Sequence, residues 1–369
     1  MDFKKAGLKK MDLKMMDLSF FKSKKVLVTG HTGFKGSWLC RILMYAGASV
    51  TGYSLEPAGE PNLFSLAGLE QGIRSETGDV RDYRRMAGLF KEIRPEIVFH
   101  LAAQPIVREG YLNPRFTYET NVMGTVNLLE CVRKTDSVKS LVNVTTDKVY
   151  KNNEQSRGYR EEEPLDGFDP YSNSKSCSEL VTHSYVNSFF QGENFPAVST
   201  ARAGNVIGGG DFGKDRIIPD CIRAVAGGQV IAVRNPSSIR PYQHVLDCLS
   251  AYLMIAQRQY EDKSSAGFYN VGPDDSNCIT TGDLVKKFCS CWGKDASWKH
   301  CPEQDAPHET MCLKLDCSKI RSAFGWKPKL SIDQSLDLVC RFGKVWLEGG
   351  DLPAEMDREI RDYFENTDF

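Results

Sequence analysis

The sequence predicts an α/β fold, in which a doubly wound parallel sheet is followed by a smaller C-terminal lobe. Two observations predict it. Short apolar strands alternate with helices of about 10 to 15 residues from Lys25 onward, a pattern typical of parallel sheets. A glycine-rich segment, 30–36, lies where the first strand runs into the first helix. Strand, glycine turn and helix in that order begin many folds of this class.

The alternation continues along the first half of the chain. We expect strands at 26–29, 49–53, 96–101, 140–144 and 197–202, and helices at 36–45, 83–93, 117–133 and 171–190. The polar, acidic stretch 151–169 contains Pro164 and is expected to be a loop. These elements form the first domain, 20–204, to which later segments return.

The character of the chain changes after Asn205, where glycines and prolines break it into short elements. We expect helical or partly helical segments at 240–256, 281–291 and 332–348, and a strand-like stretch at 234–243. Residues 205–369 are expected to form mainly a substrate-binding lobe over the C-terminal edge of the sheet. Residues 1–19, rich in Lys, Met and Asp, are expected to be a flexible leader.

Composition argues against several classes of protein. The chain has 369 residues, 41% of them hydrophobic, 26% charged, and a formal net charge of −1. Such a balance gives no reason to expect nucleic acid or a membrane as partner. No apolar run suggests a membrane span or an export signal, so we expect a cytoplasmic protein. The 12 cysteines lack the paired spacing of a zinc site and are expected to be free thiols, with no metal.

The segment 30–36 has glycines suited to a dinucleotide pyrophosphate. Gly30 allows a tight turn, Gly33 lets backbone N–H groups approach the phosphates, and Gly36 lets the helix pack on the strand. The spacing is G-x-x-G-x-x-G instead of the more familiar G-x-G-x-x-G, and an ordinary glycine-rich turn is the alternative. Suspected functional residues also follow the other strands, at 102–104, 145–148 and 202–211. In an open parallel sheet these positions share one edge, where ligands bind.

Tyr171 and Lys175 lie four residues apart at the start of a helix and therefore share one face. A cationic lysine stabilises a phenolate, so it can bring the pKa of a tyrosine from about 10 toward neutrality. Such a tyrosine can take the proton of an alcohol while a nicotinamide takes the hydride. A surface pair is the alternative, but Thr146 at a strand end and the glycine turn favour the catalytic interpretation.

These motifs together resemble the extended short-chain dehydrogenase/reductase superfamily, whose fold is of Rossmann type. Asp79-Val80 and the segment 121–125 are also similar to its pattern, and Thr146-Asp147-Lys148 resembles the catalytic segment of its nucleotide-sugar 4,6-dehydratases. The CDP-glucose branch of these dehydratases is similar over about residues 20 to 348. That likeness is carried by segments 30–38, 101–105, 146–148, 240–245, 308–309, 315–316 and 325–328.

The resemblance implies an NAD-dependent lyase that oxidises C4 of a nucleotide-linked glucose, removes water across C5 and C6, and returns the hydride to C6. Tyr171 would be the base at the 4-hydroxyl, Lys175 would bind the nicotinamide ribose and tune Tyr171, and Thr146 would hydrogen-bond the 4-oxygen. Asp147 would protonate the departing 6-hydroxyl.

Lys148 stands where the dTDP-glucose enzymes carry a glutamate. A carboxylate is a natural base for the C5 proton, whereas a lysine must first lose its own proton. Lys148 is therefore interpreted as the C5 base, as a group that stabilises the enolate, or as a salt-bridging residue at a loop start.

The resemblance also implies the ligand contacts. The cofactor residues by carry-over are Gly30, Thr32, Gly33, Phe34, Lys35, Gly36, Asp79, Val80, Leu101, Ala102, Ala103, Asn121, Tyr171 and Lys175. The substrate residues are Gln104, Asn205, Arg216, Pro219, Arg240 and His308. The second strand ends Tyr53-Ser54-Leu55-Glu56, without an acid where NAD enzymes often place one, so NAD rests on the resemblance.

Several assignments keep an alternative. Asp79 would hydrogen-bond the adenine, or it would cap the following helix. Arg216 and Arg240 would bind the diphosphate through their planar forks, or they would form surface ion pairs. His244 and His308 would contact substrate, or they would be structural. Rival functions are a nucleotide-sugar 4-epimerase, a dehydratase of another nucleotide-linked glucose, and an NAD-binding scaffold protein.

The resemblance further implies a homodimer or higher oligomer through helices 117–133 and 171–190. It also implies a place in the biosynthesis of CDP-linked 3,6-dideoxy sugars of bacterial lipopolysaccharide O antigen.

Overall fold

The computed structural model describes residues 16–366 apart from 156, 193, 295 and 303–312. Within these residues a parallel sheet of seven strands has the order β11-β6-β5-β4-β1-β2-β3. Its strands are β1 (Lys25–Thr29), β2 (Ser49–Ser54), β3 (Arg74–Thr77), β4 (Ile97–His100), β5 (Ser140–Thr145), β6 (Ala197–Ala203) and β11 (Phe268–Val271). The predicted doubly wound α/β fold is confirmed.

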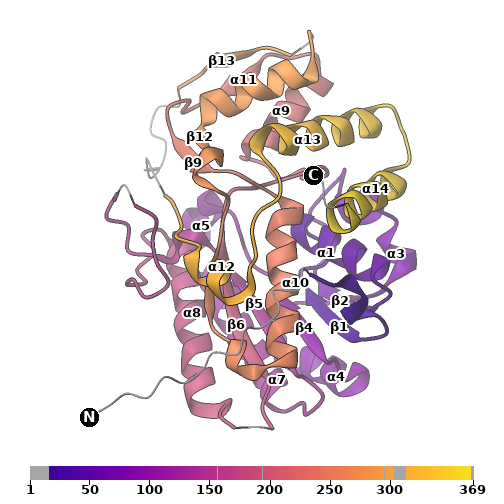
Figure 1. Ribbon diagram of the computed structural model, residues 1–369, viewed down its shortest axis with the longest axis vertical. Coiled ribbons are helices and arrows are strands. Elements are labelled where there is room, and N and C mark those ends of the chain that lie inside the picture. The colour runs from indigo at the N-terminus through magenta and orange to yellow at the C-terminus, as the bar shows by residue number, and fades with distance from the viewer. Residues whose placement is uncertain (1–15, 156, 193, 295, 303–312, 367–369) are drawn as a thin grey trace.

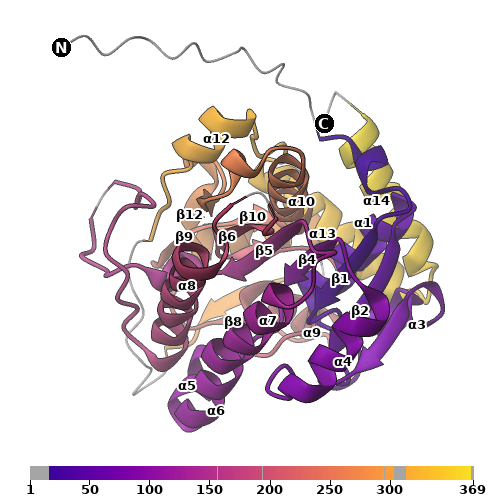
Figure 2. The same cartoon turned by 90° about the horizontal axis from the view of Figure 1, so that it is seen from below.

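Alternating side chains of the inner strands enter two separate cores, because successive residues of a strand point to opposite faces. In β1, Val26 and Val28 belong to one core and Leu27 to the other. The first core is covered by α1 (Phe34–Tyr45), α10 (Val245–Glu261) and α14 (Leu352–Glu365), and the second by α4 (Tyr83–Ile93), α7 (Gly124–Arg133) and α8 (Pro170–Phe189). Figure 2 shows the two helix layers on opposite sides of the sheet.

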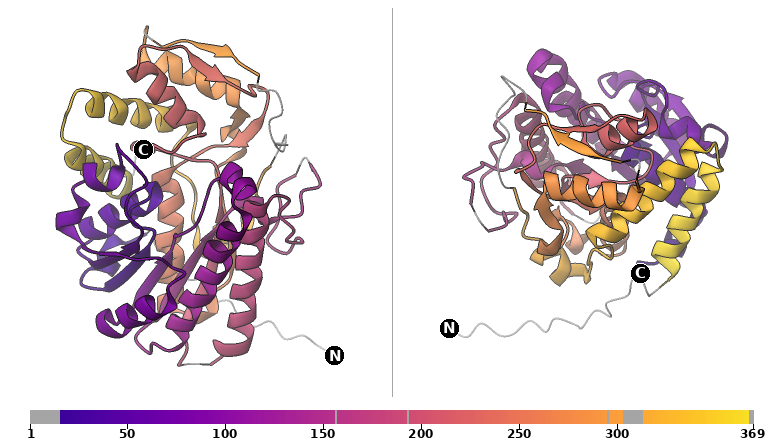
Figure 3. Two further views of the ribbon diagram at one scale, coloured as in Figure 1. Left: turned by 180° about the vertical axis from the view of Figure 1, so that it is seen from behind. Right: turned by 90° about the horizontal axis from the view of Figure 1, so that it is seen from above.

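The lobe lies beyond one end of the sheet (Figures 1 and 3). Its core is formed by apolar residues of α9 (Ile217–Ala226), α11 (Thr281–Trp292) and α13 (Ile332–Leu347). Its paired short strands are β7 (Val206–Ile207) with β10 (Gln243–His244), β8 (Ile231–Val233) with β13 (Trp298–His300), and β9 (Ile239–Pro241) with β12 (Cys278–Thr280). The remaining helices are α2 (Leu63–Leu66), α3 (Leu69–Gly72), α5 (Val107–Leu112), α6 (Pro114–Tyr118) and α12 (Ser318–Phe324).

Several segments beyond residue 204 return to the sheet, as the predicted domain division allows. β11 extends the sheet beside β6, and α10 and α14 cover its first core. The contacts of the last helix include a hydrogen bond from Tyr363 to Asp247 of α10 (2.7 Å) and an ion pair between Asp357 and Arg41 of α1 (2.6 Å). The domain functions assigned to 20–204 and 205–369 stay predictions.

Two predicted helices differ from the structure. The segment 117–133 is α6, a π-helical turn Glu119–Met123 and α7. The helix expected from residue 240 begins only at Val245, because residues 239–244 form β9 and β10 around Pro241, and a proline disfavours helix in the residue before it. Of the predicted leader, residues 1–15 lie outside the described residues, while Leu18 packs against the first core.

Candidate active site

The glycine turn between β1 and α1 has the close approaches that its sequence predicts. Gly30 has a φ of +75°, and a Cβ there would lie 2.7 Å from the backbone nitrogen of Ala102. A Cβ on Gly36 would lie 2.1 Å from the carbonyl oxygen of Gly30. Gly33 is the N-cap of α1 and provides no side-chain cap, so the helix N-terminus is open toward the turn. These contacts suit the approach of a pyrophosphate to bare backbone N–H groups.

Three other residues of the turn point in different directions. The Thr32 hydroxyl lies 2.9 Å from the Ser54 hydroxyl and donates to the carbonyl oxygen of Leu55, at the end of β2. Phe34 packs against the first core. Lys35 donates to the Tyr252 hydroxyl on α10 (3.4 Å), which carries its amine toward the site instead of outward.

Asp79 follows β3 and accepts hydrogen bonds from the backbone N–H (2.9 Å) and the guanidinium (2.6 Å) of Arg81. Burial opposes ionisation, but these bonds outweigh it and lower the pKa of Asp79. The N-cap of α4 is Asp82, which accepts from the backbone of Arg85. The capping alternative for Asp79 is therefore wrong. Val80, beside it, is buried.

The loop after β4 is held by Asn121, which lies in the π-helical turn. Its side chain accepts from the backbone N–H of Gln104 (2.8 Å) and donates to the carbonyl of Gln104 (3.1 Å) and to Ser174 of α8 (2.9 Å). The Gln104 amide donates to Thr117 and accepts from Ile106. Gln104 was predicted to bind substrate, and its amide is engaged with its own neighbours. Leu101, Ala102 and Ala103 form the loop facing the glycine turn.

Thr146 and Asp147 are buried directly after β5, at the carboxyl edge of the sheet. The Thr146 hydroxyl donates to Asp147 Oδ1 (2.9 Å), and the Asn205 amide donates to Asp147 Oδ2 (3.1 Å). A Cβ on Gly204 would lie 2.1 Å from the Asp147 carboxyl group, so glycine is needed there to admit it. Lys148, in contrast, is exposed. The structure thus joins Asn205 to the Thr146-Asp147 pair, which was predicted from a different segment.

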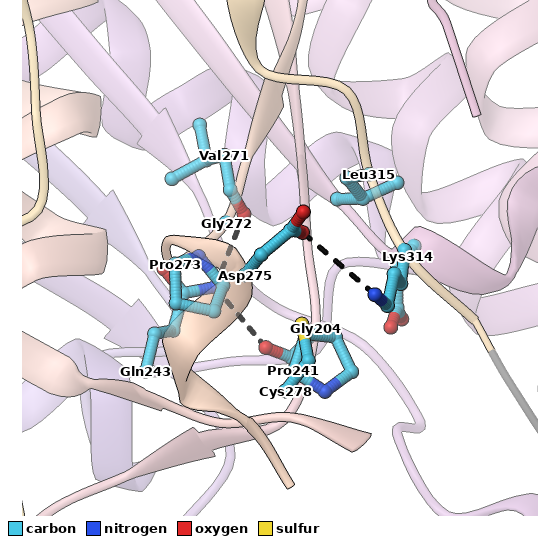
Figure 4. Close-up of a pocket in the computed structure, with 11 residues that line it drawn as sticks. Gly204, Pro241, Gln243, Val271, Gly272, Pro273, Asp275, Cys278, Lys314 and Leu315 are labelled. Carbon is cyan, nitrogen blue, oxygen red and sulfur yellow. Dashed lines mark hydrogen bonds and ion pairs between the residues drawn. The ribbon is translucent and has the colours of Figure 1, made fainter. Parts of the chain in front are cut away.

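A small pocket opens beside the Asp147 carboxyl group, between the ends of the strands and the lobe (Figure 4). Gln243 lies on one side of it, where its amide donates to the carbonyls of Gly204 and Val271 (both 3.1 Å). Lys314 and Asp275 face each other across it at 3.8 Å. Asp147 therefore borders the junction of the two parts of the molecule.

Tyr171 lies in the first turn of α8, which Asp169 caps by accepting from the backbone of Ser172 (3.0 Å). Burial is the largest influence on Tyr171 and raises its pKa to about 12. The charge of Asp147 also raises this pKa, whereas a hydrogen bond with Thr146 and the charge of Arg216 lower it. Tyr171 and Thr146 thus meet as the resemblance implies.

Lys175 is buried one turn further along α8, and its amine donates to the backbone carbonyl of Val144 (3.0 Å). Burial and the like charge of Lys35 lower the pKa of Lys175 to about 7, against the opposing effect of Glu179. The predicted tuning of Tyr171 by Lys175 stays a prediction, since the described contacts of the amine run to β5.

The predicted substrate arginines lie on the lobe side. Arg216 pairs with the buried Asp211 (3.0 Å) and remains 36% exposed. Arg240 lies on β9, where it donates to the carbonyl of Ile239 (2.9 Å), and Pro219 is buried in the first turn of α9. His308 lies outside the described residues.

His244, the other histidine considered, has a structural position. It is buried, and its Nδ1 accepts from the backbone N–H of Leu246 as the N-cap of α10. Burial lowers its pKa to about 3. These contacts favour the structural alternative for His244.

Sequence reasoning missed Tyr252, which is buried on α10 and contacts Lys35. The charges of Tyr171 and Asp147 act on its pKa, which burial raises well above its usual range, so its hydroxyl belongs to the same cluster. Tyr252 is one apolar-face residue among many in a buried helix, and only its nearness to Lys35 distinguishes it. Cysteine thiols are free where the structure describes them, and no group of metal-binding side chains occurs among those residues.

Comparison with known proteins identifies the family to which the chain belongs. The GDP-mannose 4,6 dehydratase family model matches residues 27–339. The chain belongs to this family. A CDP-glucose 4,6-dehydratase of Salmonella typhimurium is 47% identical over 359 residues, which cover 96% of this chain and 99% of the relative. A dTDP-glucose 4,6-dehydratase of Haemophilus influenzae is 26% identical, covering 84% and 95%.

Solved structures share the fold. UDP-glucose 4-epimerase of Thermus thermophilus in complex with NAD has a TM-score of 0.75 at 26% identity, covering 86% of this chain and 98% of that one. The dTDP-glucose 4,6-dehydratase of Bacillus anthracis has a TM-score of 0.74 at 23% identity, covering 89% and 99%. Among the described residues no helix is both long and apolar enough to cross a membrane.

In this member of the GDP-mannose 4,6 dehydratase family, a phenol and a carboxyl group lie on the same threonine hydroxyl. Tyr171 is a phenol whose proton affinity depends on Thr146, and Asp147 is a carboxyl group within hydrogen-bond reach of the same threonine. An alcohol at Thr146 would therefore meet a proton acceptor on one side and a proton donor on the other. Oxidation followed by loss of water needs such a pair.

Proposed function

We propose that this protein converts CDP-glucose to CDP-4-keto-6-deoxyglucose with NAD as its bound cofactor. The observation that carries the proposal is the buried Thr146–Asp147 pair beside Tyr171, in a chain that is 47% identical over nearly its full length to a curated CDP-glucose 4,6-dehydratase. A simple alcohol dehydrogenation would need no Asp147. An acid at that position supports elimination of water.

The glycine turn fits the cofactor. A Cβ on Gly30 or Gly36 would collide with neighbouring backbone, so only glycine allows this tight turn, and Gly33 leaves the N-terminus of α1 without a side chain over it. Thr32, Asp79 and Asn121 are proposed to complete the site for the rest of the dinucleotide. When bound, NAD supplies hydride acceptance from C4 and hydride return to C6.

The remaining chemistry belongs to the side chains. Tyr171 takes the proton of the 4-hydroxyl, and the 4-oxygen accepts a hydrogen bond from Thr146. Because the pKa of Tyr171 is about 12, the phenolate needs a cationic neighbour at neutral pH, which is the role proposed for Lys175. The new 4-ketone acidifies the C5 proton, and Asp147 protonates the departing 6-oxygen.

Lys148 is the group whose role is least constrained. Its side chain is exposed and directly follows the buried Asp147 in the chain. We propose that it serves C5, either as the base or by stabilising the enolate. Lys148→Glu restores a carboxylate base, and Lys148→Met removes both functions. Activity in the glutamate variant alone supports the base, and loss in both supports enolate stabilisation.

On the lobe side, we propose that residues 205–369 hold the nucleotide. Arg216, Arg240, Asn205 and Pro219 are the candidates of the described part, and Gln104 borders the sugar from the sheet side. We also propose a homodimer through the helices on the α8 side, where Met123 and Leu180 are 50% and 53% exposed. A monomer mass in light scattering would contradict the dimer. The proposed pathway is that of CDP-linked dideoxy sugars.

The test is incubation of the purified protein with CDP-, dTDP- and UDP-glucose separately, followed by the alkali-induced absorbance of a 4-keto-6-deoxy sugar. Product from CDP-glucose alone is expected. Product from another nucleotide would transfer the proposal to that substrate. A galactose-configured product would support the 4-epimerase, and bound NAD without turnover of any sugar would support the scaffold protein.

A further inference from the structure

A buried ion pair lies below the proposed site and takes no part in the mechanism above. Glu179 of α8 and Arg202 of β6 are joined at 2.9 Å, and their side chains are 1% and 3% exposed. Burying two charges costs more than their attraction returns unless further hydrogen bonds satisfy them. A pair retained at such a cost is expected to hold neighbouring parts of the structure in place.

The carboxylate of Glu179 connects α8 to two strands. Glu179 accepts hydrogen bonds from the hydroxyls of Thr145 at the end of β5 (2.5 Å) and Thr200 in β6 (2.7 Å). Thr145 immediately precedes Thr146. The same carboxylate thus fixes the separation between the helix that carries Tyr171 and the strand that carries Thr146.

The guanidinium group of Arg202 contacts the chain on the C-terminal side of Thr146. Arg202 donates to the hydroxyl of Tyr150 (2.8 Å) and to the carbonyl of Glu161 (3.0 Å), and it lies over the Tyr150 ring. The Tyr150 hydroxyl in turn donates to Asn270 of β11 (2.6 Å). Thr145 and Tyr150, on either side of 146–149, are therefore both anchored to the pair.

Glu179 also faces Lys175, because residues four apart lie on one side of a helix. Lys35 of α1 also lies near the Lys175 amine, and its like charge disfavours the protonated form of Lys175. His100 of β4 lies near it too, and its own pKa is lowered to about 3, mainly by burial and also by the charge of Lys175. Glu179 is the negative charge that offsets Lys35 among the described residues around this amine.

We infer that Glu179 and Arg202 are positioning residues for this site: Glu179 keeps the Lys175 amine protonated and holds α8 against β5, and Arg202 fixes the Thr146–Lys148 segment through Tyr150. The inference rests on the proposed function insofar as Lys175 acts as a cation. Neither residue touches the reacting atoms, so both act through others.

The test compares Glu179→Gln, Glu179→Asp and Arg202→Lys with Glu92→Gln, which removes a carboxylate from an exposed ion pair with Arg74. Two quantities are measured across pH: kcat/KM for CDP-glucose, and the affinity for NAD in the absence of sugar. Lys175 works as a cation, so both quantities fall as the pH rises through its pKa. Without the charge of Glu179 that pKa falls, and the alkaline limb moves about one pH unit downward.

Glu179→Asp keeps the charge and is expected to leave the alkaline limb where it is in the unaltered protein. Arg202→Lys keeps the charge but loses the fork that reaches Tyr150, so kcat falls about tenfold or more while the limb stays in place. Glu92→Gln changes neither quantity. Thermal unfolding of each variant shows whether the purified protein is folded.

An unchanged alkaline limb in Glu179→Gln, with activity reduced equally at every pH, would overturn the role of the charge. An unchanged kcat in Arg202→Lys would overturn the role of the Tyr150 contact, so each half is tested even where one variant does not fold. If the unaltered protein makes no keto sugar from CDP-glucose, the proposed function fails, and the NAD affinity series still tests the pair.

Discussion

On the sheet side of the site Thr146 and Asp147 are buried and bonded to each other, whereas the two arginines on the lobe side are more exposed. Thr146 and Asp147 are 4% and 2% exposed. Arg216 is 36% exposed, and Arg240 is partly exposed. If the proposed roles hold, the groups for proton transfer are fixed before the sugar arrives, while the arginines proposed to bind the nucleotide can still change conformation. Preorganisation is most valuable where charge develops.

The largest effect is expected on the sheet side. Asp147→Asn keeps the size and the hydrogen bond from Thr146 but cannot donate a carboxyl proton, so formation of keto sugar should fall about 10³-fold. Oxidation at C4 does not need Asp147. The near-ultraviolet absorbance of reduced cofactor should therefore accumulate on addition of CDP-glucose, and an absence of that signal would show that Asp147 is needed before the elimination.

A second change tests how tightly the acid is held. Gly204→Ala places a methyl group 2.1 Å from the Asp147 carboxyl group and should displace it, with a loss of about 10²-fold in kcat. Gly88→Ala in α4 is the control, because a Cβ there meets nothing within 4 Å. Wild-type kcat in the Gly204 variant would mean that the position of Asp147 is not fixed.

A smaller effect is expected on the lobe side. Arg240→Ala should raise KM for CDP-glucose about tenfold and leave kcat nearly unchanged, since a charge-assisted hydrogen bond to a diphosphate binds ground and transition states alike. Arg74→Ala, in an exposed ion pair on β3, is the control. An unaltered KM would support the alternative that Arg240 forms only a surface ion pair.

The smallest effect concerns stability. The pKa of His244 is about 3 in the folded protein and about 6.5 when unfolded. The unfolded state therefore binds the extra proton first, and stability is lost as the pH falls below about 6.5. His244→Asn keeps an N-cap but does not titrate. The loss in unfolding free energy between about pH 7.5 and 5.5, from urea titrations, should shrink by about 1.4 kcal/mol. An equal loss in both proteins would contradict the buried, neutral histidine.

The sequence predicted best the elements whose pattern is local. The strands β1 and β5 contain the apolar residues Val26–Val28, Leu141, Val142 and Val144, and the capped start of α8 follows a proline-containing loop, so their positions were predicted within a residue or two. β3, in contrast, reads Arg-Ser-Glu-Thr and is largely exposed at the sheet edge, so it carries no apolar signal. β11 is mostly buried and contains apolar residues, but its four residues between two glycines are too few to show a strand period, so it was missed as well.

The site was predicted as a set of residues but not as a set of contacts. Because the carboxyl ends of parallel strands share one edge of a sheet, Gly30, Ala102 and Thr146 could be assigned to that edge without any knowledge of side-chain contacts. The bond from Asn205 to Asp147 joins residues 58 apart, and the pair of Glu179 and Arg202 lies on two different elements. No periodicity encodes such contacts, because they depend on how the elements pack.

The fastening of α14 has a consequence for synthesis of the chain. The first helix, α1, shares its core with α14, and the buried Asp247 accepts from Tyr363 and from the backbone of Lys329. While a ribosome is still producing residues before 352, the side of α1 that packs against α14 is uncovered and the carboxylate of Asp247 lacks the hydrogen bond from Tyr363. The emerging chain is therefore expected to gain its full resistance to proteolysis in a single late step, when the last helix closes over the first.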